Sequence, residues 1–297
     1  MTVRRAPRGE KTPLGVVHRR PQQEVGEICG LTRWPGHFIQ KRTPVFRPGR
    51  HSGRMNAVQT GGALAAAIEA LLPGMCPHCD HPLGGSDRGL CGSCWSLAVP
   101  RAGGVCRRCG VPTEDSSDPC LACLQASPPQ SATVVWGEHD GVLRTAILAL
   151  KHGGRDDLAA PLGERLAASI AVESWASLID CIVPIPSHPW RRLKKPWSAS
   201  ELLADSVSRR LERPTIRLLR RHGLGRQTGR SRARRLELPE RSFSARTEAD
   251  GRTPLLIDDV TTTGTTLKRA AQALRHAGAS AVYCGVCAHT PDPRRFS

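Results

Sequence analysis

The chain has 297 residues, and its 43 Lys and Arg outnumber its 26 Asp and Glu to give a formal net charge of +17. Apolar residues make up 39% of the sequence, enough for a globular core of moderate size. No apolar run reaches the ~18 residues that a membrane-spanning helix needs, and no secretory signal pattern is visible. We therefore expect a protein of the cytoplasm that has no membrane span.

The first 54 residues differ in composition from the rest. They hold twelve Lys and Arg against three Glu, so this stretch carries +9 of the net charge of +17. It has no sustained apolar period, and we predict a disordered basic extension over residues 1–54. Two interpretations stay open: the extension is a basic arm that holds nucleic acid, or translation starts at Met55 and the extension is not native protein.

Cysteine pairs dominate the next segment, which begins with an apolar stretch over 57–73 that we expect to be a short helix. Twelve cysteines without a secretory signal favour metal ligation over disulfides. Eight of them form four Cys-x-x-Cys pairs: Cys76 and Cys79, Cys91 and Cys94, Cys106 and Cys109, Cys120 and Cys123. Two such pairs complete a tetrahedral Cys₄ site. We predict a double zinc ribbon within residues 57–125 that holds two structural Zn²⁺ ions, with sequential pairs sharing a metal.

A fifth Cys-x-x-Cys pair, Cys284 and Cys287, lies in a short apolar run that is typical of a buried strand. Residues three apart on a strand point to opposite faces, so these thiols should diverge. We interpret both as core cysteines, and Cys181 in its β-branched run likewise.

Strand and helix patterns alternate over residues 132–291. Runs at 133–136, 180–186, 252–260 and 280–288 favour strands, and helical patterns begin near residues 141, 158, 198 and 261. This alternation predicts an α/β domain with a parallel sheet flanked by helices on both faces. Residues 220–245 show little regular pattern and read as a long exposed loop.

The stretch LLIDDVTTTGTTL at 255–267 is the most informative part of the chain. Its acids, Asp258 and Asp259, follow a buried strand at the carboxyl end, where parallel sheets bind ligands. The threonines then lead into a helix N-terminus, whose backbone N–H groups bind anions, and Gly264 allows close backbone approach. Two acids before a phosphate cradle suit a ribose phosphate, whereas an ordinary acidic cap of a strand–helix turn is the alternative.

IDDVTTTGTT resembles the phosphoribosyl diphosphate (PRPP) signature of type I phosphoribosyltransferases. The order of the other motifs resembles the competence protein ComF family, which includes the GntX proteins. These motifs are the Cys-x-x-Cys module, LRTAILALKHGGRDDLA at 143–159, IVPIPSHPWRRL at 182–193 and GRQTGRSRARRLEL at 225–238. The resemblance covers residues 57–290 and implies a type I phosphoribosyltransferase-like sheet in the C-terminal domain.

The resemblance also implies roles for individual residues. Asp258 and Asp259 would be the catalytic pair that meets the ribose hydroxyls, with Mg²⁺ accompanying PRPP. The 5′-phosphate would lie on Thr261, Thr262, Thr263, Gly264, Thr265 and Thr266. Other implied contacts are Arg191 and Arg192 near the pyrophosphate, Lys151 and Arg155 as further contacts of the site, and Gln227, Arg234 and Arg235 in a lid over it.

Two functions follow from these patterns. The first is a PRPP-binding phosphoribosyltransferase of unknown acceptor, linked by its family to DNA uptake in natural competence. The second is a non-catalytic accessory protein that binds single-stranded DNA and contacts other DNA-uptake proteins. It is favoured by the seven arginines, with no acid, at 220–235. Relatives carry arginine-glycine-phenylalanine-asparagine-glutamine where this chain has Lys195–Ala199, and this departure leaves the acceptor pocket and catalysis open.

Overall fold

The computed structural model describes residues 74–85, 87–101, 103–113, 118–187, 197–222 and 242–290. By its contacts the chain separates into two units, Met1–Ala57 and Val58–Ser297, and every described residue belongs to the second. The predicted extension over 1–54 and the predicted helix over 57–73 lie outside the described residues. In the part that is described, no helix has both the length and the apolar character to cross a membrane.

Four parallel strands form the central sheet. They are β1 (Ala132–Glu138), β2 (Cys181–Pro184), β5 (Pro254–Thr261) and β6 (Tyr283–His289), and their order across the sheet is β1-β6-β5-β2. The register places Leu255 of β5 opposite Tyr283 of β6, and Cys181 of β2 opposite Pro254. All four carboxyl ends therefore meet at one edge of the sheet, as the alternating pattern predicts.

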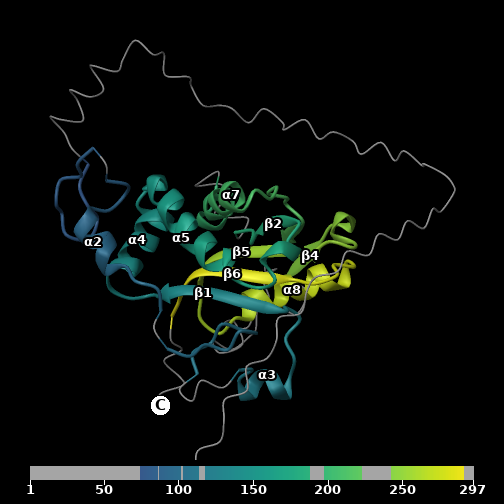
Figure 1. The fold of residues 1–297 in the computed structure, drawn as a ribbon. Coiled ribbons are helices and arrows are strands. Elements are labelled where there is room, and N and C mark those ends of the chain that lie inside the picture. The colour runs from purple at the N-terminus through teal and green to yellow at the C-terminus, as the bar shows by residue number, and fades with distance from the viewer. Residues whose placement is uncertain are drawn as a thin grey trace, which may run out of the picture. The chain divides into compact units, whose positions relative to one another are not determined.

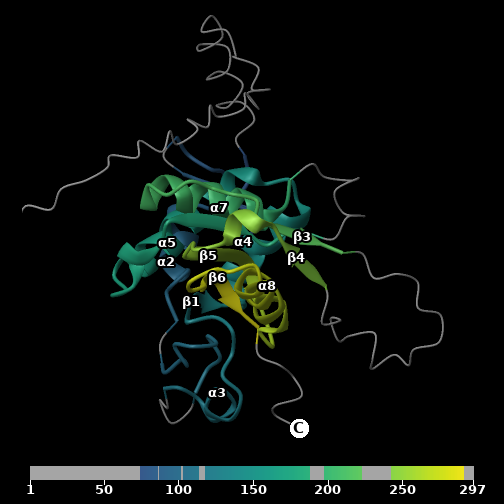
Figure 2. The ribbon, with the colours of Figure 1, turned by 90° about the vertical axis from the view of Figure 1, so that its right-hand side faces the viewer.

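Helices cover both faces of this sheet (Figure 1). In chain order the α-helices are α2 (Gly92–Leu97), α3 (Leu121–Gln125), α4 (Gly141–His152), α5 (Ala159–Ala171), α7 (Ala199–Leu211) and α8 (Thr265–His276). Short 3-10 turns are η1 (Asp156–Leu158), η2 (Ala176–Leu178) and η3 (Thr247–Ala249). The buried residues of α4, α5 and α7 share one core with one face of the sheet, and those of α8 pack in a second core on the other face. The turned view of Figure 2 shows the same layers, with α7 and α8 on opposite sides of β5 and β6.

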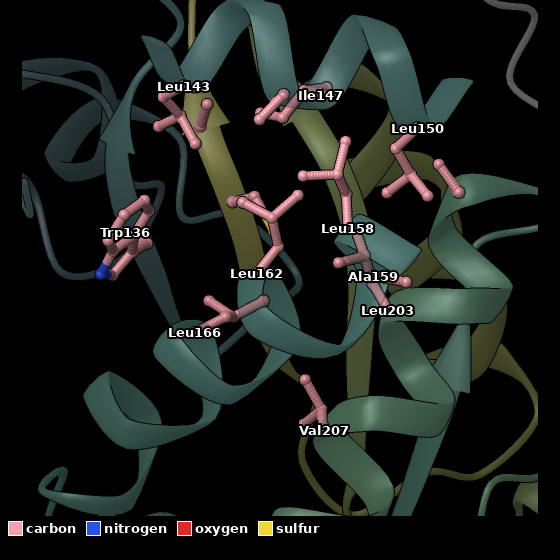
Figure 3. Packing of buried hydrophobic residues seen from close by; sticks show 14 of the residues in the cluster. Trp136, Leu143, Ile147, Leu150, Leu158, Ala159, Leu162, Leu166, Leu203 and Val207 are labelled. Carbon is pink, nitrogen blue, oxygen red and sulfur yellow. The ribbon is translucent and has the colours of Figure 1, made fainter. Parts of the chain in front are cut away.

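The larger core lies between the sheet and the three helices α4, α5 and α7, and Figure 3 shows its packing. Helix α4 buries Val142, Leu143, Ala146, Ile147 and Leu150, the positions that its apolar spacing predicts. Leu158 is completely buried, so truncating it to Ala should cost about 3 kcal/mol of stability.

The cysteines of β6 confirm the prediction that they diverge. Cys284 belongs to the core under α8, whereas Cys287 belongs to the core under α4 and α5. Both are fully buried, and burial raises the pKa of each thiol. Cys181 is buried as well, and burial raises its pKa to about 12. None of the three has the properties of a reactive thiol.

The prediction of a loop over 220–245 is wrong at the two ends of this range. Its two ends form an antiparallel pair, β3 (Leu219–Arg221) with β4 (Phe243–Ala245), in which Arg221 lies opposite Phe243. Each strand has three residues, too few for periodicity to reveal. The residues between them, 223–241, lie outside the described part.

Candidate active site and zinc centres

The predicted acid pair lies at the carboxyl end of β5. Asp258 is opposite Val286 of β6, and the neighbouring β2 ends at Pro184, opposite Ile257. Both carboxylates are half-buried, and Asp259 keeps 13% of its side chain exposed. The pair therefore lies at the edge of the sheet where the topology expects a ligand.

Side chains from two helices hold these carboxylates. Ser200, in the first turn of α7, donates from its Oγ to Oδ1 of Asp258 at 2.8 Å. Lys151, near the end of α4, places its Nζ 2.9 Å from Oδ1 of Asp259. Backbone N–H groups also reach Oδ1, from Asp259 to Asp258 at 3.0 Å and from Val260 to Asp259 at 2.7 Å.

The Oδ2 atoms of the two carboxylates differ from the Oδ1 atoms in their hydrogen bonding. The hydrogen bonds that described residues donate to Asp258 and Asp259 all end on Oδ1. Neither Oδ2 is among the fully buried side-chain atoms that lack a partner. Each acid thus has one oxygen that no hydrogen bond from a described residue reaches.

The pKa values of Asp258 and His139 are both shifted from their ordinary values. Burial, together with the neighbouring Asp259 carboxylate, raises the pKa of Asp258 to about 7. Burial also lowers the pKa of His139, which follows β1, and the cations Lys151 and Arg144 lower it further. Near pH 7 Asp258 therefore titrates, while His139 favours its neutral form.

The threonine turn connects the acid pair to α8. Gly264 has φ of 72°, and an added Cβ at this position would find no atom within 4 Å, so the turn is open on that side. Thr262 and Thr263 are exposed, and the Thr263 and Thr265 hydroxyls lie 2.8 Å apart. The Nε2–H of the buried His289 donates to the carbonyl of Thr262 at 3.0 Å and fixes the turn to the end of β6. The first turn of α8 contains no acid, so its N–H groups face no built-in anion.

The other predicted contacts divide into three groups. Lys151, a further contact that the resemblance implies, lies at Asp259. Arg155 instead turns to the first zinc ribbon and donates to the carbonyls of Met75 at 2.8 Å and Gly89 at 3.0 Å, while also pairing with Asp157. Five predicted residues lie outside the described ranges: Arg191, Arg192, Gln227, Arg234 and Arg235.

One residue of the site escaped sequence reasoning. A capping box formed by Ser198 and Glu201 starts α7 just before Ser200. A serine at the second position of a helix has no signal of its own, because its partner Asp258 comes from a distant strand.

The eight ribbon cysteines gather into two groups of four. Within each group the sulfur atoms all lie within 4.8 Å of one another, which suits a tetrahedral Zn²⁺ ion. The first group joins Cys76 and Cys79 to Cys91 and Cys94, and the second joins Cys106 and Cys109 to Cys120 and Cys123. Sequential pairing is therefore confirmed, and the ribbon holds two four-cysteine zinc-binding sites.

The two ribbons contact different parts of the α/β domain. Cys76, Cys91 and Cys94 belong to the same core cluster as Leu158. A Cβ added at Gly89 would lie 2.4 Å from Leu158 Cδ2, so the first ribbon packs tightly there.

The second ribbon lies along β1, one of the two outer strands of the described sheet. The N–H of Thr133 donates to the Arg107 carbonyl at 2.6 Å, and the Thr133 hydroxyl donates to the Arg108 carbonyl at 2.9 Å. Just before this ribbon, the N–H of Arg101 donates to the carbonyl of Trp136 at 2.8 Å.

Comparisons with known proteins agree with this architecture. The double zinc ribbon domain family matches residues 67–124, and the phosphoribosyl transferase domain family matches residues 196–296. Among solved structures, one titled as the allosteric regulatory enzyme of purine biosynthesis matches at 26% identity and a TM-score of 0.32. That match covers 43% of this chain and 25% of the other.

Curated relatives match over most of their length. DNA utilization protein YhgH of Salmonella typhimurium and that of Escherichia coli K12 are each 31% identical over 225 residues, covering 71% of this chain and 95% of the relative. Competence protein F of Haemophilus influenzae is 26% identical over 211 residues, covering 68% of this chain and 91% of the relative. With its double zinc ribbon ahead of a phosphoribosyltransferase domain, the chain belongs to the ComF family, together with these DNA utilization and competence proteins.

Proposed function

We propose that the site at the end of β5 binds PRPP and that the protein transfers its phosphoribosyl group to an acceptor nitrogen. The observation that supports this most directly is the acid pair with one uncommitted oxygen on each carboxylate. Two adjacent acceptors of this kind match the two neighbouring hydroxyls of a ribose, each of which donates one hydrogen bond.

The turn after the acids suits the 5′-phosphate. Backbone N–H groups at the start of α8 have no acceptor within their own helix, and the helix dipole favours an anion there. The exposed Thr262 and Thr263 add hydroxyl donors, and the open space at Gly264 leaves room for phosphate oxygens. A ribose held by the acids would thus have its phosphate at the helix end.

The residues present also fit Mg²⁺, because carboxylate oxygens are ligands that this ion prefers. Asp258 and Asp259 would hold it through their free oxygens, directly or through water, and the ion would neutralise charge on the diphosphate. Lys151, at 2.9 Å from Asp259, supplies a further positive charge beside the site. The bond between C1 of the ribose and the diphosphate oxygen breaks, a bond from C1 to the acceptor nitrogen forms, and that nitrogen loses its proton. The protein orients the reactants and stabilises the developing charge.

Titration of PRPP by calorimetry, with and without Mg²⁺, tests the proposal. We expect Mg²⁺-dependent binding that D258N and D259N each weaken at least tenfold. Glu248→Gln is the matched control, because Glu248 is an exposed acid whose ion pair with Arg246 spans 4.0 Å. Binding of PRPP by a D258N/D259N double variant as tightly as by the parent would refute the site.

A second function is favoured by the names of the relatives, which refer to DNA utilization and competence. Under this alternative the protein binds single-stranded DNA through the arginines at 220–235, seven in all, and need not catalyse. Strand β3 carries the first two, Arg220 and Arg221.

Salt dependence separates the two functions. Binding through a single-strand backbone should weaken with salt at a slope of about −0.7 per phosphate neutralised. Changing Arg230, Arg232, Arg234 and Arg235 together to Ser should then reduce both DNA affinity and this slope. Unchanged DNA binding in that variant would exclude the stretch as a DNA surface, and loss of PRPP binding alone would assign it to the phosphoribosyl site as a lid.

A further inference from the structure

Trp197 is an exposed indole that is nevertheless held in place. Among the described residues it is the single aromatic side chain in the group of exposed large hydrophobic residues, with 44% of its surface exposed. Its Nε1–H donates to Oδ2 of Asp156 at 2.6 Å, which restricts the ring to one orientation. An immobilised and solvent-exposed ring has lost its conformational entropy before any ligand arrives.

Two connections link this indole to residues that hold the acid pair. Trp197 precedes the N-cap of α7 by one residue, and Ser200, three residues further on, donates to Asp258. Three residues span at most about 11 Å of chain. Its partner Asp156 follows α4, the helix whose Lys151 contacts Asp259. The start of α7 and the η1 turn, which hold Trp197, therefore each lie within five residues of a contact to the acid pair.

A purely structural role explains only part of this arrangement. Trp197 occupies the position before the N-cap Ser198, from which an apolar residue can pack on Leu202 as a hydrophobic staple. A staple needs apolar surface, which Leu would supply. It needs neither an anchored N–H group nor a ring that is nearly half exposed.

We propose that Trp197 is the platform on which a planar aromatic acceptor, such as a nucleobase, stacks while the acid pair holds the ribose. This inference rests on the proposed function and adds to it the chemical class of the acceptor. Stacking on an indole tolerates any flat ring, because every base presents a π-face. Trp197 would thus contact the acceptor and set its class, and the anchoring Asp156 would act by positioning the ring.

The test compares two probes on the full-length protein. Ribose 5-phosphate occupies the acid pair and the threonine turn alone, whereas adenosine 5′-monophosphate adds a base at C1. Uridine 5′-monophosphate, with a different ring, tests tolerance. We expect each nucleotide to bind at least about tenfold more tightly than ribose 5-phosphate in the parent protein, the gain that one stacked base gives.

Three variants test whether the gain in nucleotide affinity comes from Trp197. Trp197→Leu keeps an apolar staple but removes the stacking surface, so it should reduce the nucleotide advantage to less than twofold and leave ribose 5-phosphate binding unchanged. Trp197→Phe keeps a ring but lacks the N–H that donates to Asp156, so it should retain only part of the advantage. Asp156→Ala releases the indole and should lower the advantage without abolishing it. Thermal unfolding of each variant shows that the fold is kept, and the quenching of fluorescence that Trp197→Leu removes reports on the stacked ring.

Each outcome has one meaning. A nucleotide advantage that survives in Trp197→Leu overturns the platform, as does a parent protein that binds nucleotides no better than ribose 5-phosphate. If neither ribose 5-phosphate nor PRPP binds the parent protein, the proposed function itself fails. Should Trp197→Leu unfold, Trp197→Phe and Asp156→Ala still decide the question, since only a stacking role requires the ring to be retained and oriented.

Discussion

Lys151 Nζ lies 2.9 Å from Oδ1 of Asp259, so the ligand-free site carries its own counter-ion. The lysine comes from the end of α4 and the acid from the end of β5. Asp258 has no comparable cation contact within the described residues, and its Oδ1 accepts from neutral donors, the Ser200 hydroxyl and the Asp259 N–H. The two adjacent acids are therefore unequal, and substitutions should distinguish them.

We predict that Asp259→Asn is the more destabilising of the two single substitutions. It leaves the Lys151 ammonium, whose side chain is only 25% exposed, without its carboxylate, at a cost of about 1–2 kcal/mol. Asp258→Asn removes a carboxylate that burial disfavours and should leave stability equal or higher at pH 8. Urea denaturation measures both, and adding Lys151→Met to Asp259→Asn should recover part of the loss. Equal effects of the two substitutions would contradict this inequality.

Stability without ligand should fall as pH rises from about 4 to about 7, to the extent that Asp258 contributes. Burial raises its pKa from 3.8 to about 7. Between these values the folded protein keeps the proton that the unfolded chain has released, so the stabilisation is complete below the lower pKa and lost above the upper one. Urea midpoints at several pH values give the slope. Asp258→Asn should flatten it, whereas Asp157→Asn, which changes an exposed acid of the η1 turn, should not.

We predict that the two zinc centres contribute unequally to the α/β domain. Cys79→Ser and Cys109→Ser should each reduce the metal content from two ions per chain to one, because each breaks one four-cysteine site. Three cysteines of the first site lie in the core cluster around α4 and α5, so Cys79→Ser should lower Tm by at least about 4 °C more than Cys109→Ser. Metal analysis and calorimetry test both statements. Similar Tm values for the two variants would show that the core does not depend on the first ribbon.

Substitutions of two glycines that have positive φ test how closely the first ribbon packs on η1. Gly89→Ala brings a Cβ to 2.4 Å from Leu158 Cδ2 at a φ of +76°. We expect it to cost about 2–4 kcal/mol, the sum of strain and overpacking. Gly154→Ala has a similar φ of +68° but open space around it, and should cost about 1 kcal/mol. Denaturant unfolding of both variants gives the difference, and equal costs would mean that the contact with Leu158 is loose.

Local patterns predicted the parts of this protein that short stretches of chain determine. The Cys-x-x-Cys pairs fix two thiols at a time, and their short separations favour sequential sharing of a metal, which the structure confirms. The alternation of strand and helix likewise predicts the parallel sheet, and the acid pair falls at its carboxyl edge. The faces of Cys284 and Cys287 follow from the period of a strand alone.

Contacts between distant segments were harder to predict from the sequence. Nothing near Ser200 shows that it donates to Asp258, and the ion pair of Lys151 with Asp259 depends on how α4 docks on the sheet. Arg155 lies in the same motif as Lys151. Its guanidinium nevertheless donates to the Met75 and Gly89 carbonyls of the first ribbon and not to the acid pair. Sequence spacing cannot separate two such neighbours, since their directions are set by packing.

The position of the second ribbon along β1 has a consequence for solubility. An outer strand with free N–H and C=O groups is a template on which strands of other molecules pair, and proteins commonly cover such edges. Here the N–H of Thr133 donates to the Arg107 carbonyl, and the N–H of Arg101 donates to the carbonyl of Trp136. Removal of the second metal would release this cover while the α/β domain stays folded. A variant that loses only this metal, such as Cys109→Ser, should then aggregate through β1, so the second ribbon limits self-association.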